Sequence, residues 1–169
     1  MDVTFEHKRT YISRNKLKDY MLKLGGYINI LIAMGHIVGL FWADEMFEVT
    51  GIGKEMTELA QTHTSLPFLL TIFVAIVFFI FGLYGLSAAE IIRKLPFQKT
   101  VIFSIAGIYL LRGFGELIAD NMRGTNALSE TIYSIFAIAI GLLFLLGGLI
   151  KWNFKHLREK TLVEKPSGY

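Results

Sequence analysis

Residues 67–89 read PFLLTIFVAIVFFIFGLYGLSAA, a run of 23 residues without a charged side chain. A helix rises about 1.5 Å per residue, so this run is long enough to cross a hydrocarbon core of about 30 Å. Three further apolar stretches of about 19 to 22 residues lie at 25–43, 100–118 and 129–150. The sequence therefore predicts an all-α integral membrane protein with a four-transmembrane-helix bundle.

The composition supports a single membrane domain that covers residues 1–169. Of the 169 residues, 53% are hydrophobic and only 18% are charged, whereas soluble domains carry about 25% charged residues. Fourteen per cent of the residues are aromatic, which excludes a disordered chain. The absence of cysteine excludes a disulfide scaffold, cysteine-ligated zinc and iron–sulfur ligation.

The basic residues predict how the chain is oriented in the membrane. Fourteen of the 17 Lys and Arg residues lie before the first span, between spans two and three, or after span four. Because cytoplasmic loops carry the excess of positive charge, both termini should be cytoplasmic in a multi-pass protein of the cell membrane. Residues 1–24 should form a basic juxtamembrane helix on the anionic lipids of the inner leaflet, and 151–169 a basic tail. The net charge of +3 then reflects topology, with no nucleic-acid partner.

The first external loop, residues 44–66, is the longest connection and is acidic. Lys54 to Gln61 should form a short helix, with Met56, Leu59 and Ala60 against the end of the bundle. Pro67 suits the first turn of the second span. This loop is interpreted as a packing cap or as a lid over the outer end.

Small residues are concentrated in the spans, which hold 12 of the 16 glycines. Gly35 and Gly39 form a G-x-x-x-G pattern in the first span, and Ser134, Gly141 and Gly148 recur every seven residues in the fourth. Helices in lipid associate through close packing of small residues. These Gly-rich helix faces predict packing within the bundle or, alternatively, self-association of the chain.

Ionisable side chains inside the spans are the candidate functional residues, because a charge there costs about 2.5–3.5 kcal/mol and usually faces the protein interior. His36 lies about 10 Å from the outer end of the first span, with Asn29 two turns below on the same face. Arg112 and Glu116 share a face of the third span, and Tyr109 lies one turn below them. Trp42, Glu45, His63 and Asp120 lie near the outer rim. Glu90 ends the second span on the inner side, with Lys94 four residues later as an ion-pair partner.

This distribution predicts an outward-facing polar pocket in the outer half of the membrane. The ligand-binding residues would be His36, Tyr109, Arg112 and Glu116. Arg112 would hold an anion or a carbonyl oxygen, Glu116 would orient Arg112, and His36 would exchange a proton. The alternative interpretation is an internal Arg–Glu–His network that fixes the register of the helices. The residues contain no catalytic motif and identify no cofactor, and Arg112 would repel a metal cation.

Two short segments, GLYGLSAA at residues 82–89 and LLRGFGE at residues 110–116, resemble the DoxX-like group of small four-helix membrane proteins. The resemblance implies a four-helix bundle that serves as an accessory subunit of a membrane redox system, with a membrane oxidoreductase as its partner. Two other functions remain open from the residues alone. One is an oligomeric channel or transporter built on the glycine faces, and the other is a purely structural partner subunit.

Overall fold

The computed structural model describes the backbone of residues 3–123 and 128–163, and the side chains of 16–43, 45–119, 121–122, 128 and 130–152. Within these residues the fold is entirely helical. The long helices are α1 (Val3–Gly39), α4 (Leu66–Ala88), α5 (Gln98–Arg123) and α6 (Leu128–Val163). A short 3₁₀ turn, η1 (Leu40–Trp42), and two small helices, α2 (Ala43–Val49) and α3 (Gly53–Thr62), connect α1 to α4.

Four helices are long and apolar enough to cross a membrane, as predicted. The candidate spans are Lys16–Trp42, Leu66–Ala88, Gln98–Ala119 and Glu130–Trp152. They agree with the expected spans except at the first, which begins nine residues earlier than residue 25. The reason is that α1 runs unbroken from Val3 to Gly39, so the juxtamembrane helix and the first span form one continuous helix.

The spans pair as α1 with α4 and as α5 with α6, and glycines make both pairings close. A Cβ atom on Gly85 of α4 would lie 2.7 Å from the Cα of Gly26 on α1. A Cβ on Gly113 of α5 would lie 2.8 Å from the carbonyl oxygen of Ser134 on α6. Such distances are shorter than van der Waals contact, so each pair of helices requires a residue without a side chain at the crossing.

The small residues of the fourth span pack within the bundle, whereas the G-x-x-x-G glycines of the first span contact no other span. Ser134 is buried, Gly141 faces Leu110, and Gly148 faces Ile102, so this line of small residues packs against α5. In contrast, Gly35 has no atom within 4 Å of its Cβ position. The G-x-x-x-G pattern therefore does not mark the close helix contact of α1, which lies nine residues earlier at Gly26.

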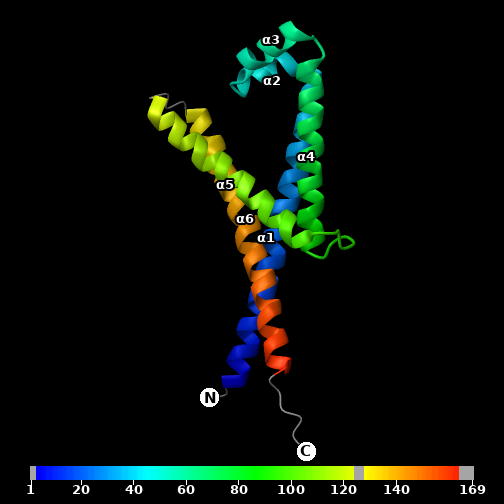
Figure 1. Cartoon of the computed structure of the whole chain (residues 1–169), viewed down its shortest axis with the longest axis vertical. Coiled ribbons are helices and arrows are strands. Elements are labelled where there is room, and N and C mark those ends of the chain that lie inside the picture. Colours follow the sequence, from blue (N-terminus) through cyan, green and yellow to red (C-terminus); the bar gives the residue numbers. More distant parts are fainter. Residues whose placement is uncertain (1–2, 124–127, 164–169) are drawn as a thin grey trace, which may run out of the picture.

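The four helices form a bundle only near the α4–α5 loop, and toward the end that carries α2 and α3 they separate into two arms (Figure 1). As labels, we call the end with the α4–α5 loop the inner end and the end with α2 and α3 the outer end. We call the two arms the α1–α4 arm and the α5–α6 arm. They meet where the buried ring of Phe144 on α6 packs 3.1 Å from the Cβ position of Gly25, and where Gly147 faces Leu22 of α1. Helices α4 and α5 follow one another in the chain but have few contacts with each other.

Helices α2 and α3 cap the outer end of the α1–α4 arm (Figure 1). Helix α3 confirms the short helix expected over Lys54 to Gln61, and Met56, Leu59 and Ala60 form its half-buried face. Helix α2 was not predicted. The turn between the two helices contains Gly51 at a φ of 77°, a left-handed conformation that glycine adopts without strain.

A hydrogen-bonded loop closes the inner end between α4 and α5. The buried Ser87 hydroxyl donates to the carbonyl oxygen of Arg93 at 2.8 Å and accepts from the backbone N–H of Leu95 at 2.9 Å and from Gln98 Nε2 at 2.6 Å. These bonds use the full capacity of one hydroxyl group. The loop is consequently fixed to the last turn of α4.

Lys151 of α6 also contacts the end of α4. Its ammonium group donates to the carbonyl oxygen of Ala88 and lies 3.4 Å from Glu90 Oε1. The expected pairing of Glu90 with Lys94 is wrong, because α4 ends at Ala88 and Glu90 adopts a φ of 62°. The two residues do not share a helix face, and Lys151 takes the place of Lys94.

Candidate functional site

The base of the candidate site is a buried hydrogen bond between the two arms. Tyr109 of α5 donates its hydroxyl hydrogen to Asn29 Oδ1 of α1 at 2.7 Å. Asn29 Nδ2 donates in turn to the carbonyl oxygen of Gly25 at 2.8 Å. Asn29 is fully buried and Tyr109 is 5% exposed. This pair satisfies buried polar groups that would otherwise be left unpaired, and it fixes α5 against α1.

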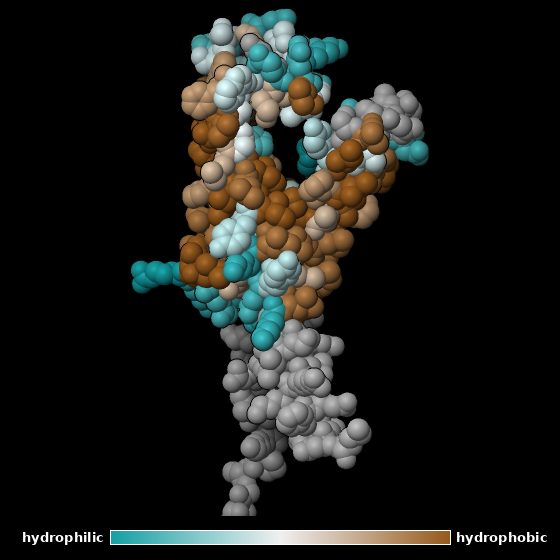
Figure 2. All heavy atoms as spheres, turned by 180° about the vertical axis from the view of Figure 1, so that it is seen from behind, coloured by the Kyte–Doolittle hydropathy of each residue, from teal (hydrophilic) through white to brown (hydrophobic). Residues whose placement is uncertain are grey.

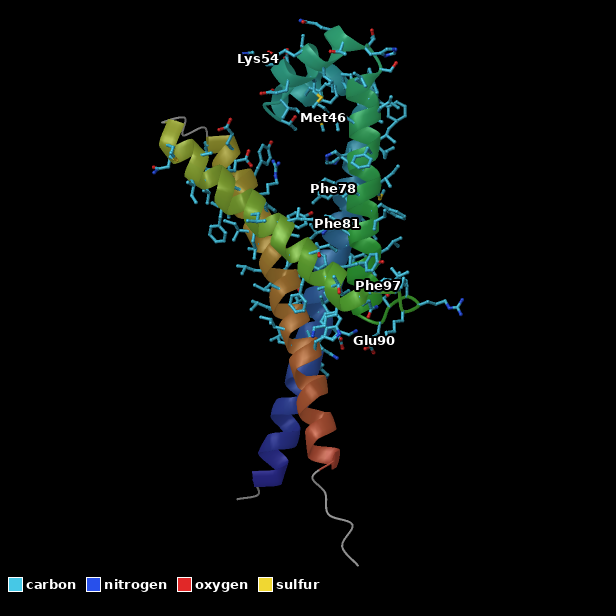
Figure 3. All side chains as sticks on the ribbon, in the orientation of Figure 1. Met46, Lys54, Phe78, Phe81, Glu90 and Phe97 are labelled. Atoms are coloured by element: carbon cyan, nitrogen blue, oxygen red, sulfur yellow. The ribbon has the colours of Figure 1, made fainter. Side chains whose placement is uncertain are left out.

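A layer of aromatic rings lies beside this bond. Phe78 of α4 is 6.3 Å from the ring of Tyr109 and 5.2 Å from the ring of His36, and Phe81 is also 6.3 Å from Tyr109. Phe78 and Phe81 lie one above the other on α4 (Figure 3). His36 is half-buried, and its Nδ1 lies 2.8 Å from the carbonyl oxygen of Ile32. Phe78 thus connects His36 of the first arm to Tyr109 of the second.

Arg112 and Glu116 extend the same face of α5 toward the outer end. They follow Tyr109 by three and seven residues, which places all three on one helix face. Arg112 Nη2 lies 3.3 Å from Glu116 Oε2, and the side chains are 64% and 35% exposed. Glu116 Oε2 is nevertheless a buried atom without a hydrogen-bond partner among the described residues. The ion pair therefore leaves most guanidinium donors of Arg112 available.

We call the gap between the two arms above the Phe78–Tyr109 contact the outer cleft. His36 and Phe78 belong to the α1–α4 arm, and Tyr109, Arg112 and Glu116 belong to the α5–α6 arm. Figure 2 shows an open gap between the two arms above a largely hydrophobic body. The base is closed by the ring contacts of Tyr109 with Phe78 and Phe81. The helices of the two arms diverge from there toward the end that carries α2 and α3 (Figure 1).

The structure brings together some of the predicted site residues and separates others. Asn29 with Tyr109, and Arg112 with Glu116, are in contact. His36 reaches Tyr109 only through Phe78, and among the described side chains no hydrogen bond or ion pair joins it to Arg112. His36 on α1 and Arg112 on α5 therefore belong to different arms.

The secondary candidates lie outside the outer cleft. Trp42 in η1 packs edge-on against Phe41 at 6.2 Å, and Glu45 in α2 is exposed. His63 follows α3 and accepts a hydrogen bond from the backbone N–H of Ser65 at 3.3 Å. Glu90 lies at the inner end beside Lys151, and the side chain of Asp120 lies outside the described residues. Among the described side chains, no hydrogen bond or ion pair joins any of these four residues to Arg112.

Phe78 and Phe81 are the residues that sequence reasoning missed. They belong to a continuous apolar run in a chain with 14 phenylalanines, so nothing in their spacing separates them from lipid-facing neighbours. Their role becomes visible only once α1, α4 and α5 are placed side by side.

The donor set of the cleft suits an anion or a polarised oxygen. Arg112 provides planar N–H donors that match carboxylate or phosphate oxygens. Among the described residues, no three His, Asp or Glu side chains lie close enough together to hold a metal ion. Comparison with known protein families, with curated proteins and with solved structures finds no match to this chain. The site must therefore be interpreted from its own geometry.

Proposed function

We propose that this protein is a multi-pass membrane protein that binds a small amphiphilic ligand in the outer cleft. Arg112 holds an anionic or carbonyl group of the ligand, Glu116 orients the guanidinium, and His36 exchanges a proton. The apolar body of the ligand lies against Phe78 and the neighbouring hydrophobic wall.

The observation that carries the proposal is the exposure of Arg112. The Arg112 side chain is 64% exposed, yet Arg112 lies seven residues inside the span Gln98–Ala119, about 10 Å from its outer end. A charge at such a depth is costly unless polar groups or water surround it. Glu116 meets only one edge of the guanidinium, so a polar ligand headgroup or water completes its surroundings.

The orientation of the cleft follows from the basic residues. We propose that both termini are cytoplasmic in the cell membrane, because 14 of the 17 Lys and Arg residues lie on the side of the termini and the α4–α5 loop. The outer cleft then opens toward the outer leaflet. A role as an accessory subunit of a membrane redox system is suggested by the DoxX-like resemblance, and co-purification of a second chain would support it.

Native mass spectrometry of the protein extracted in a mild detergent tests the proposal. We expect the wild-type chain to carry a defined extra mass. This mass should be absent from Arg112→Ala, and a smaller fraction of His36→Ala molecules should carry it. Lys54→Ala is the matched control, because Lys54 is an exposed residue of α3 outside the cleft (Figure 3). A bare chain in every variant, or an extra mass that Arg112→Ala retains, would favour the structural interpretation of the Arg112–Glu116 pair.

A further inference from the structure

The hydrogen bond of His36 determines which of its ring nitrogens can react. Nδ1 lies 2.8 Å from the carbonyl oxygen of Ile32, in the preceding turn of α1. A carbonyl oxygen only accepts hydrogen bonds, so Nδ1 must carry the hydrogen. In the neutral ring, Nε2 is then the proton acceptor, and no described residue donates to it. His36 is thus held as a base whose reactive nitrogen lacks a protein partner.

The ring of His36 belongs to the aromatic layer beside Tyr109. It packs at 5.2 Å against Phe78, which is also 6.3 Å from the ring of Tyr109. Arg112 follows Tyr109 by three residues, about one helical turn. The Phe78–Tyr109 contact therefore connects a proton acceptor on one arm with the helix that carries a guanidinium on the other. Glu116 leaves guanidinium donors available, because its Oε2 makes no hydrogen bond within the described residues.

We infer that the ligand is a long-chain monocarboxylic acid that enters the outer cleft sideways from the outer leaflet as the neutral acid. This inference rests on the proposed function and specifies its ligand class. In the cleft the carboxyl O–H bond breaks, its electron pair stays on the oxygen, and the proton binds His36 Nε2. The products are a carboxylate paired with Arg112 and an imidazolium on His36, so the net charge does not change.

The groups in the cleft favour this class over other amphiphiles. An alcohol is too weak an acid to protonate imidazole, and the diester phosphate of a membrane phospholipid has no proton to give at neutral pH. An amine would be repelled by Arg112. A carboxylic acid offers a transferable proton to Nε2 and, afterwards, two oxygens that match the planar guanidinium. Its neutral form also reaches the cleft through hydrocarbon, where a free carboxylate is strongly disfavoured.

The test uses the full-length protein in nanodiscs of uncharged phosphatidylcholine, with its histidines labelled with ¹⁵N. The chain has four histidines, and His36→Gln assigns the His36 signal by its loss. Oleic acid, methyl oleate and oleyl alcohol are the probes. We expect oleic acid to convert the His36 signal saturably from the neutral Nδ1–H form to imidazolium, whereas methyl oleate and oleyl alcohol leave it neutral.

Two variants test whether the response of His36 to oleic acid depends on Arg112. Arg112→Gln should raise the oleic acid concentration at half-saturation about 10- to 100-fold, the range expected when a hydrogen bond to a charged group is lost. His63→Gln is the control, because His63 lies after α3 and outside the cleft, and it should leave the His36 response unchanged. The wild-type comparison of the three probes does not depend on the folding of any variant.

Two outcomes would overturn the inference, and they separate it from the proposed function. If methyl oleate saturates the site as well as oleic acid does, or if His36 remains neutral at saturation, proton transfer from a carboxylic acid is wrong. If native mass spectrometry at the same time finds another ligand that Arg112→Ala loses, the proposed binding function stands with a different ligand class. If no ligand depends on Arg112, both proposals fail.

Discussion

Replacing Gly85 with alanine tests the closest contact between α1 and α4. The new Cβ atom would lie 2.7 Å from Gly26 Cα, 2.9 Å from Gly26 N and 3.1 Å from the carbonyl oxygen of Leu22. All three are backbone atoms, so no side-chain rotation can relieve the overlap. Carbon atoms pack at about 3.5 Å or more, so the two helices must separate locally by roughly 1 Å.

The size of the effect follows from two opposing contributions. Overpacking a close contact destabilises a protein by about 1–3 kcal/mol, and alanine recovers at most about 1 kcal/mol through its better helix propensity. We therefore expect Gly85→Ala to lower the free energy of unfolding by about 1–2 kcal/mol. Gly107→Ala is the matched control, because Gly107 lies on α5 with no atom within 4 Å of its Cβ position. This variant should be neutral or slightly stabilised.

Reversible unfolding in mixed micelles, with sodium dodecyl sulfate as the denaturant and circular dichroism as the signal, measures both variants. The reasoning predicts a lower midpoint for Gly85→Ala and an unchanged or higher midpoint for Gly107→Ala. Equal midpoints in the two variants would refute the close α1–α4 crossing. A cross-link between cysteines introduced at exposed positions of α1 and α4 would then show whether the two helices are neighbours at all.

Three further predictions concern the polar contacts. Tyr109→Phe leaves the buried Asn29 Oδ1 without its hydrogen-bond donor and should lower the free energy of unfolding by about 1 kcal/mol. Tyr133→Phe, at an exposed position, is the control in the same micelle titration. Lys151→Met should lower the free energy of unfolding by about 1–2 kcal/mol, because the hydrogen bond to the carbonyl oxygen of Ala88 is lost. Glu90→Gln should change it by less than about 0.5 kcal/mol, because Glu90 is exposed. Equal losses in the two variants would show that the ion pair matters as much as the bond to Ala88. Ser87→Ala removes the hydroxyl that binds Arg93, Leu95 and Gln98, and limited proteolysis should then cleave the α4–α5 loop at least several-fold faster than in the wild type.

The parts of the fold that depend on local sequence could be predicted. Long apolar runs with few charged residues identify the four spans, because a charge inside a span is costly. Helix α3 follows from the spacing of Met56, Leu59 and Ala60, which form its half-buried face. The contact between Arg112 and Glu116 follows from their separation of four residues on one helix.

The parts that depend on how helices are placed relative to one another could not be predicted. The sequence alone does not distinguish Gly26 from Gly35, and only the position of α4 makes Gly26 the residue of close helix contact. Phe78 becomes part of the candidate site because α1 and α5 approach it from two sides. Glu90 pairs with Lys151, 61 residues away in the chain, because α6 passes the end of α4. Hydropathy and spacing carry no information about such long-range contacts.

A specific ligand in the outer cleft can be distinguished from bulk lipid in a simple gap by its effect on the free energy of unfolding. At the inner end the arms are joined by Phe144 against Gly25 and by Lys151 at the end of α4. Above Tyr109 the two arms have no comparable contact within the described residues, and Gly35 and Gly115 meet no neighbouring atom. A ligand that contacts both His36 and Arg112 would supply the missing link between the arms.

Such a ligand would bind the folded protein and not the unfolded chain. A free ligand concentration of 100 times Kd should therefore raise the free energy of unfolding by about 2.7 kcal/mol. Bulk lipid contacts both arms without such specificity, so its stabilising effect would be the same in Arg112→Ala, whereas that of the ligand would be lost.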